Sequence, residues 1–258
     1  MREYIKELIK RKDLLIYLVM SGLKAQHRNT FLGYFWWLLD PLLLSAVYYF
    51  VVVVIFNRGG ENFGLYLVIG MITWRWLAST ITGASRSIIG QGGIISQVYL
   101  PKMIFPLGAG LTQLVNFSFG LIVIAIFLAF FRVVPGVEVL WLPVIIIVQQ
   151  LFLIAISLVV AYISVFVRDI ENLLGPFKLV WFFGSPVIWI REDIPANLLW
   201  MVNLNPAAAL LDSYRNVLMH GSNPEFFKLF IMGIASLIVI AVAIYYYNKN
   251  EHKIIKVL

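Results

Sequence analysis

The sequence contains no cysteine and has few charged residues. Of the 258 residues, 13% are Asp, Glu, Lys or Arg, which is about half the share that soluble domains usually carry. The absence of cysteine excludes disulfides, thiol catalysis and cysteine-based zinc sites. The apolar share is 61%, and a water-soluble globule or a disordered chain could not keep that much apolar surface from water. Lipid is therefore the solvent for most of this chain.

Several catalytic motifs are also missing. The chain has no GxxxxGK[ST] loop, no HExxH pair and no GxSxG elbow, so it offers no set of residues for ATP hydrolysis, metal-dependent hydrolysis or acyl transfer. Its three histidines, His27, His220 and His252, are far apart in the sequence. A membrane-embedded transferase would need clustered carboxylates or histidines at one depth, and none is found. We predict that the chain is not an enzyme and holds no metal and no cofactor of its own.

Long apolar runs predict an all-α polytopic membrane protein. A helix needs roughly 20 apolar residues to cross a bilayer, and continuous rather than alternating runs favour helices over a barrel. The fifth run is short and contains Pro176 and Pro186. We predict one transmembrane domain over residues 31–258, with six spans at 31–56, 64–83, 104–131, 140–167, 173–190 and 226–247.

The basic residues are distributed unevenly between the two sides that six spans define. Thirteen of the 20 Lys and Arg residues fall on the side of the two termini, seven of them in residues 1–30. Because short cytoplasmic segments carry the excess of Lys and Arg, we predict a cytoplasmic (inner) membrane protein with both termini in the cytoplasm. The net charge of +7 is then a topology signal, and no nucleic-acid partner is expected.

Three segments are not spans. Residues 1–30 have apolar and basic side chains at helical spacing, which predicts an amphipathic helix at the cytoplasmic interface, either as a membrane anchor or as a docking surface. Residues 85–103 form a polar loop with a short helix at 94–100. From the residues alone it is more often a connector than a contact for a motor protein.

The segment 190–224 lies on the outer side and is too polar to span. Structureless loops of this length are unusual unless functional, so we predict short helices at 195–202 and 206–219, dipping into the interface. Asn205 and Pro206 suit the cap and first turn of the second helix. Asp212 and Arg215 are three residues apart and are predicted to pair.

Ionisable and aromatic residues within the predicted spans suggest a path for a substrate through the membrane. Asp40, Arg75 and Lys178 lie inside predicted spans. For Arg75 and Lys178 we favour an interhelical pair or a side chain reaching the interface. Interfacial belts explain about half of the aromatic residues. The others could stack on sugar rings and line a substrate channel; the candidates are Tyr34, Trp36, Trp37, Tyr48, Trp74, Trp181, Phe182 and Trp189.

Four patches together resemble the membrane subunit of ABC-2-type polysaccharide exporters. O-antigen exporter permeases are the nearest in pattern, and teichoic-acid exporter permeases are near kin. The chain departs from the pattern at Ser21-Gly22, where Arg-Asp is common, at His27 and at Asp40. The patches are Asp13–Leu43, Val98–Lys102 with Pro106, Val167–Ile170, and Ser185–Val187 followed by Asn205-Pro206 and Tyr214-Arg215.

The resemblance implies a homodimer of permease subunits, bound to two separate ATPase subunits that hold ATP and Mg²⁺. The cargo would be a lipid-linked polysaccharide, with membrane lipids around the dimer. The ATPases would contact residues 1–30 and the loop 85–103, through Lys24, Arg28, Ile94, Ser96, Tyr99, Pro101 and Lys102. Residues 190–224 would form gate helices at the outer mouth, with Asn205, Pro206, Asp212 and Arg215 as gate residues. A permease for a small lipid or drug, and a channel or scaffold that needs no ATPase, stay open as alternatives.

Overall fold

A computed structural model describes residues 2–26, 31–57, 60–97 and 100–257, and the regular elements in these ranges are all helices. The long helices are α3 (Trp36–Tyr49, continued by the π-helical turn Phe50–Ile55), α4 (Phe63–Ser87), α6 (Ile104–Phe130), α7 (Leu142–Phe166, preceded by the 3₁₀ turn Val137–Trp141) and α11 (Phe226–Val257). The shorter ones are α1 (Arg2–Lys10), α2 (Lys12–Gln26), α5 (Gly92–Gln97), α8 (Ile170–Phe183), α9 (Leu199–Leu204) and α10 (Pro206–Arg215). The all-α prediction is confirmed for the described residues.

Five helices of the described chain are long and apolar enough to cross a membrane: Leu38–Ile55, Phe63–Ser87, Ile104–Phe130, Val137–Phe166 and Phe226–Ile254. They correspond to five of the six predicted spans. The remaining span, predicted at 173–190, differs. Its helix α8 has 14 residues and ends at Phe183, so it measures about 21 Å. Pro176 lies inside α8, whereas Pro186 lies beyond it, in a segment of turns.

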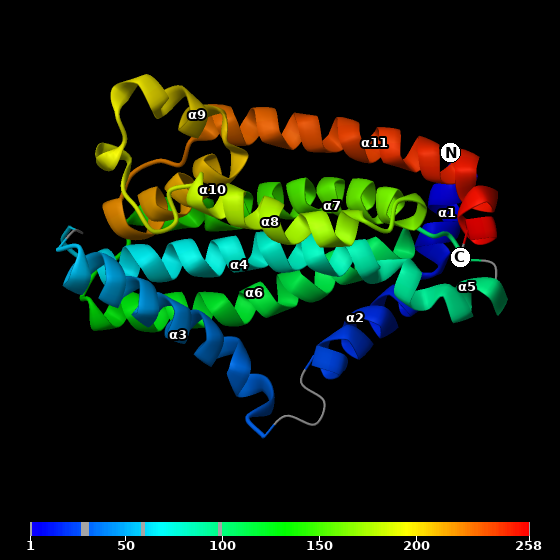
Figure 1. Cartoon of the computed structure of the whole chain (residues 1–258), viewed down its shortest axis with the longest axis horizontal. Helices are drawn as coiled ribbons and strands as arrows, with labels where there is room; N and C mark the ends of the chain where they lie inside the picture. The colour runs from blue at the N-terminus through cyan, green and yellow to red at the C-terminus, as the bar shows by residue number, and fades with distance from the viewer. Residues whose placement is uncertain (1, 27–30, 58–59, 98–99, 258) are drawn as a thin grey trace.

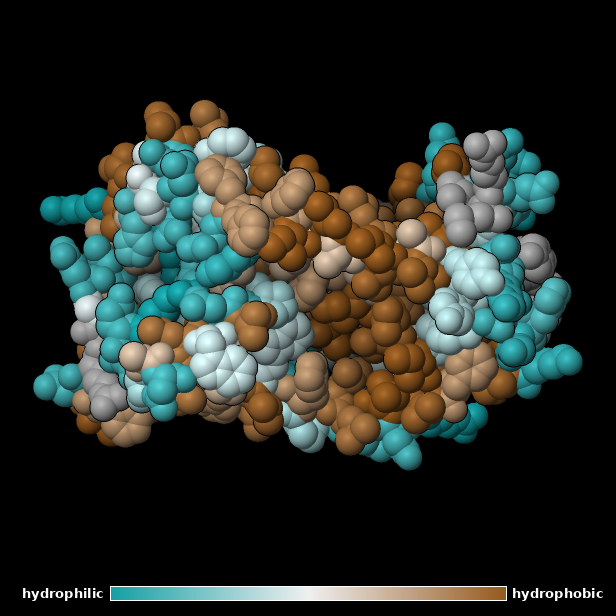
Figure 2. Space-filling model, turned by 90° about the horizontal axis from the view of Figure 1, so that it is seen from above, coloured by the Kyte–Doolittle hydropathy of each residue, from teal (hydrophilic) through white to brown (hydrophobic). Residues whose placement is uncertain are grey.

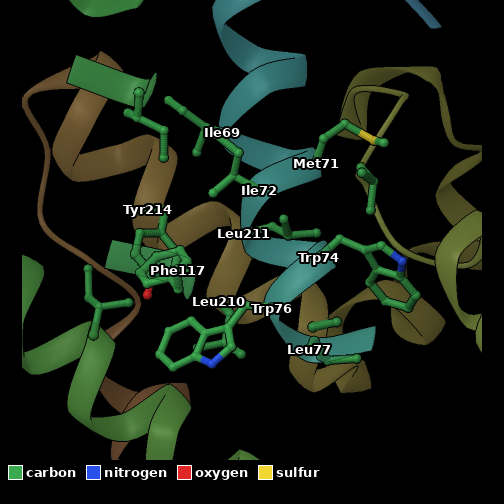
Figure 3. Close-up of a cluster of buried hydrophobic side chains, with 14 of the residues drawn as sticks. Ile69, Met71, Ile72, Trp74, Trp76, Leu77, Phe117, Leu210, Leu211 and Tyr214 are labelled. Carbon is green, nitrogen blue, oxygen red and sulfur yellow. The ribbon is translucent and has the colours of Figure 1, made fainter. Parts of the chain in front are cut away.

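Helix α4 occupies the centre of the bundle. Figure 1 shows it (cyan) between α6 and α8, with α3 crossing in front. Its buried residues run along most of its length, since it packs against α3, α6, α7, α8 and α10. The ring of Trp76 stacks on Phe117 of α6, with 4.2 Å between centroids, and Tyr214 of α10 contacts the same Phe117 at 5.9 Å (Figure 3). This aromatic core fixes α4, α6 and α10 relative to one another.

The two ends of the bundle differ in what they carry. At one end lie α1, α5 and the C-terminal end of α11, and we call this the terminal end (Figure 1). At the other end lie α9 and α10, and we call it the hairpin end. The chain returns from α7 to the hairpin end through α8 and the turns after it. Seen from the side of α11, a hydrophobic band separates two more hydrophilic ends (Figure 2), as expected for a protein that spans a bilayer.

The N-terminal segment forms two helices rather than the single helix predicted over residues 1–30. The break falls at Arg11, between Lys10 and Lys12. Helix α2 leans along α6, where Leu18 meets Gly108 and Thr112 meets Gly22. It then diverges from α3, leaving the two helices splayed apart (Figure 1).

Candidate functional site

A cavity of about 390 Å³ opens where α2 and α3 diverge. Four helices contribute to its wall, and the lining combines polar with aromatic side chains. The lining residues are Gln26 of α2; Trp36, Asp40 and Pro41 of α3; Ile72, Arg75, Trp76 and Ser79 of α4; and Gln113, Asn116, Phe117 and Gly120 of α6. Polar and charged side chains between apolar membrane helices cost free energy and usually mark a functional site. This cavity is therefore the leading candidate site.

An ion pair joins two walls of this cavity. Nη2 of Arg75 donates to Oδ2 of Asp40 at 2.8 Å and so connects α4 to α3. The two side chains are 38% and 41% exposed, so both charges also reach the open cavity. The interhelical partner that we predicted for Arg75 is confirmed, and it is Asp40.

Amide side chains form a second polar cluster in the cavity. Nδ2 of Asn116 donates to Oε1 of Gln26 at 2.8 Å and to Oε1 of Gln113 at 2.9 Å. None of these three residues was among the predicted site residues. Gln113 and Asn116 are three apart in an otherwise apolar helix, so they share one face. That spacing is the signal that could have found them.

The predicted aromatic lining residues do not lie together in one cavity. Trp36 lines the cavity. Trp74 and Phe182 are buried, with 8% and 6% exposed, and their rings contact each other at 5.5 Å in the contact between α4 and α8. In this structure their rings therefore pack helices together and present no open face.

The other predicted lining residues lie around this contact or beyond it. Tyr48 of α3 contacts Phe182 at 5.6 Å, and Trp181 meets Trp74 edge-on at 5.7 Å. Trp189 lies after α8, and its Nε1 donates to the carbonyl of Phe183 at 3.0 Å. The backbones of Tyr34 and Trp37 lie in the helical turns that begin α3, and their side chains lie outside the described part of the chain.

Arg215 is the most enclosed charge at the hairpin end. It is 2% exposed, and its guanidinium donates to the carbonyls of Pro186 at 2.5 Å, Val187 at 3.1 Å and Tyr66 at 3.2 Å. It also lies 3.3 Å above the centroid of the Tyr66 ring. The hydroxyl of Tyr66 in turn donates to the carbonyl of Trp189 at 2.8 Å. Arg215 thereby ties α10 to α4 and to the turns after α8.

The predicted ion pair between Asp212 and Arg215 is wrong. Oδ2 of Asp212 lies 2.7 Å from Nη2 of Arg191, because the chain folds back and brings Arg191 over α10. Burial raises the pKa of the Asp212 carboxyl, and the charge of Arg191 opposes that rise. Both residues line a second cavity, of about 320 Å³, at the hairpin end.

Asn205 holds α8 and α10 together. Its Oδ1 accepts from the backbone N–H of Ala207 at 3.0 Å, as predicted for the N-cap of α10, and from Nε1 of Trp181 at 2.8 Å. Its Nδ2 donates to the carbonyl of Gly184 at 3.0 Å and to the hydroxyl of Ser185 at 2.8 Å. Pro206 is the first residue of the helix. One amide thus joins the end of α8 to the start of α10.

Removing this amide is expected to loosen the hairpin end. Asn205→Ala should lower the free energy of unfolding by about 2 kcal/mol, because the cap and the bonds to α8 are lost together. Thermal unfolding in detergent measures the change. Asn223→Ala, at an exposed side chain, is the matched control and should unfold like the parent protein. Equal unfolding temperatures for the two variants would contradict the role of Asn205.

A buried ion pair joins two helices at the terminal end. Lys102 is 0% exposed, Glu251 is 4% exposed, and their charged groups are 3.5 Å apart. The pair links the start of α6 to the last turns of α11. The hydroxyl of Tyr4 on α1 accepts from the backbone N–H of Met103 at 3.4 Å. Helices α1, α6 and α11 therefore meet in one packed junction.

This junction changes the interpretation of the residues predicted to contact an ATPase. Lys102 and Pro101 are buried, so in this structure neither is a surface contact. Lys24 is exposed on α2. The short helix predicted at 94–100 is α5 and ends at Gln97. It includes Ile94 and Ser96, whose side chains lie outside the described part of the chain, as do Arg28 and Tyr99 altogether.

Two polar contacts join α8 to α4. Arg86 pairs with Glu171, and the ammonium of Lys178 donates to the hydroxyl of Thr82. Glu171 lies in the first turn of α8, whereas Lys178 lies past the middle of the helix. Of the two interpretations favoured for Lys178, an interhelical contact and a side chain reaching the interface, the structure shows the interhelical contact.

Comparison with known proteins places the chain in a family. Residues 13–219 match the family described as ABC-2 type transporter. Two proteins of Klebsiella pneumoniae, each named "O-antigen export system permease protein RfbA", are 27% and 28% identical over 248 residues, which is 95% of this chain and 95% of each relative. A protein of Myxococcus xanthus with the same name is 27% identical over 92% of both chains.

Proposed function

Because the chain belongs to the ABC-2 type transporter family, we propose that it is the permease subunit of an ATP-driven exporter of O-antigen polysaccharide. The observation that carries the proposal is the similarity to O-antigen export permeases over almost the full length of both chains. A similarity of that extent includes the external helices and the terminal end as well as the spans. Teichoic acid, or a small lipid or drug, is the alternative cargo.

The proposed topology has six crossings, with both termini in the cytoplasm. Five long apolar helices support five of them. The fifth crossing in chain order is made by α8 together with residues 184–190. The position of α1 and the end of α11 at one end of the bundle (Figure 1) supports an even number of crossings. The excess of Lys and Arg at that end supports its cytoplasmic location.

We propose that the conduit forms between two copies of the chain. The cavity opens between splayed helices, and the described residues of one chain leave it open on that side. Exposed apolar side chains follow one face of α3, at Val47 and Val54, and one face of α8, at Leu173, Phe177 and Val180. In a dimer, the exposed faces of α3 and α8 from both copies would together enclose a path continuous with the cavity. Trp36 and the amides of the cavity would then contact sugar rings and hydroxyls.

The energy source would be a separate ATPase at the terminal end. The chain has no phosphate-binding loop, so ATP and Mg²⁺ would be held by that partner. Helices α1, α2 and α5 offer it surfaces, with Lys24 among the exposed residues. Because Lys102 and Glu251 join α6 to α11, motion of the loop 85–103 would reach α11. At the other end, α9 and α10 are the proposed gate helices.

Two measurements test the function. The affinity-tagged chain should co-purify a P-loop ATPase from its native host. Deletion of its gene should leave O-antigen inside the cell, and restored export should require both the chain and an ATPase that can hydrolyse ATP. Export of O-antigen that continues in the deletion strain would contradict the proposed cargo. Transport that persists with an inactive ATPase would favour a channel.

The pair of Asp40 and Arg75 should matter for export more than for folding. Each single variant leaves one charge of the cavity without its partner. We therefore expect Asp40→Asn and Arg75→Gln each to lower export about tenfold, which corresponds to a free-energy loss of about 1.4 kcal/mol. Both side chains are more than a third exposed, so little change in unfolding temperature is expected. Surface O-antigen is the readout.

The reciprocal exchange provides the control for this pair. Asp40→Arg combined with Arg75→Asp restores the attraction with the charges exchanged and should recover part of the export. If each single variant exports normally, the pair is not part of the path.

A further inference from the structure

A second feature of the membrane region is a groove between α7 and α11. Figure 1 shows α7 and α11 on the opposite side of α4 from α2 and α3. Its volume is about 410 Å³ and its lining is almost wholly apolar. The wall includes Val159, Tyr162 and Ile163 of α7, and Ile238, Val242 and Tyr246 of α11. Both helices are long and apolar enough to cross a membrane, so the groove lies at the depth of the lipid chains.

The dimensions and polarity of the groove suit a hydrocarbon chain. From Ile238 to Tyr247 it follows α11 for about 13 Å. Water is unfavourable in a groove that offers it no polar partners. On the rim of the groove, Val242 and Ile238 are 49% and 59% exposed. In a bilayer the molecule adjacent to that rim is a phospholipid. An acyl chain would bury the apolar wall that the two helices leave uncovered.

One end of the groove is aromatic and leads to a basic residue. The ring of Tyr162 is 5.4 Å from that of Tyr247 and 6.5 Å from that of Tyr246. Tyr246 contacts Tyr245 at 5.7 Å, and Nζ of Lys249 lies 5.7 Å above the Tyr245 ring. Tyrosines are typical of the level of lipid headgroups. The groove therefore runs from the hydrocarbon region to the headgroup level at the terminal end.

The charge at this level is positive. Lys249 and Lys253 are exposed and four residues apart on α11, so they share a face, and Arg168 follows the end of α7. Among the described acidic residues near Arg168, Asp169 follows it directly and Glu171 pairs with Arg86, while Glu251 on α11 is buried against Lys102. Basic residues between membrane helices bind the headgroups of anionic lipids.

We propose that the groove between α7 and α11 binds one anionic phospholipid, with an acyl chain along Val242 and the phosphate next to Lys249. The site is separate from the cavity of the proposed transport path. Bound there, the lipid would contact both α7 and α11, and α11 also takes part in the junction with α1 and α6.

Native mass spectrometry of the full-length protein tests the proposal. The protein, purified in a neutral detergent, is incubated with phosphatidylglycerol or with phosphatidylcholine of the same chains, and the bound lipid is counted. Val242→Trp fills the groove from its exposed rim. Leu237→Trp, at another exposed position of α11, is the matched control. Lys249→Gln removes the proposed phosphate contact, and Lys12→Gln removes an exposed charge on α2.

The parent protein should retain one phosphatidylglycerol in preference to phosphatidylcholine. Val242→Trp should lose both lipids, and Lys249→Gln should lower the preference for the anionic lipid about fivefold, the effect of one basic side chain near a membrane surface. The two controls should bind like the parent. Retention of phosphatidylglycerol by Val242→Trp, or no preference in the parent protein, would overturn the proposal. So would dissociation of a dimer by Val242→Trp, since a second copy would then cover the groove.

Discussion

Replacing Arg215 by leucine is expected to abolish export and to lower the free energy of unfolding by about 3–5 kcal/mol, because several hydrogen bonds to a charged group are lost together. The substitution removes the guanidinium donor from three carbonyls, those of Tyr66, Pro186 and Val187. A hydrogen bond to a charged group contributes about 1.5–3 kcal/mol. Lysine should not rescue the protein, because an ammonium cannot reproduce the planar fork that reaches all three. Thermal unfolding and surface O-antigen are the readouts.

A glycine on the facing helix offers a second variant for the same contact. A Cβ at Gly70 would lie 2.5 Å from Nη2 of Arg215 and 3.0 Å from the carbonyl oxygen of Val187. Gly70→Ala should therefore displace the guanidinium and reproduce part of the loss. Arg132→Lys, at an exposed arginine, is the control and should export normally. Normal stability of Arg215→Lys would contradict the assigned role of the guanidinium.

Breaking the pair of Lys102 and Glu251 is expected to have the second large effect. Lys102→Met leaves a buried carboxylate at Glu251, and Glu251→Gln leaves a buried ammonium at Lys102. Removing one partner of a buried pair costs about 3–5 kcal/mol, whereas replacing both with apolar residues is often neutral. The double variant with Met at both positions should therefore unfold close to the temperature of the parent protein.

Thermal unfolding of the single and double variants in detergent measures this coupling. Lys256→Met, at an exposed residue of α11, is the control for loss of a positive charge. Single variants as stable as this control would contradict the pair. In the double variant, a normal unfolding temperature with reduced stimulation of the partner ATPase would show that the pair also transmits motion between α6 and α11.

Several parts of the fold could be predicted from local sequence, because their causes are local. Long apolar runs determine where the five long helices lie, although α11 continues ten residues beyond the predicted end of its span, to Val257. The cap of α10 could be predicted from Asn205-Pro206, because the capping hydrogen bond joins Asn205 to a backbone N–H only two residues later. The broken character of the fifth span follows from Pro176 and Pro186, although the sequence did not show that the helix would end before the second proline.

The errors concern residues whose partners are distant in sequence. Asp212 could pair with Arg215 on the helix surface, but folding buries Arg215 among carbonyls and brings Arg191 to Asp212. The resemblance implies a contact between Lys102 and an ATPase, but Lys102 is buried against Glu251, which lies near the other end of the sequence. The cavity was missed because it exists only where four helices bring polar side chains together.

Reconstituted transport is the most direct test of the central claim, that this chain is the permease of an ATP-driven polysaccharide exporter. The chain and its partner ATPase are placed in vesicles with lipid-linked O-antigen, and transfer across the membrane is measured with and without ATP. The account predicts transfer that requires ATP, requires both proteins and falls about tenfold with Asp40→Asn. Transfer without the ATPase, or no transfer of O-antigen by a complex that hydrolyses ATP, would contradict it.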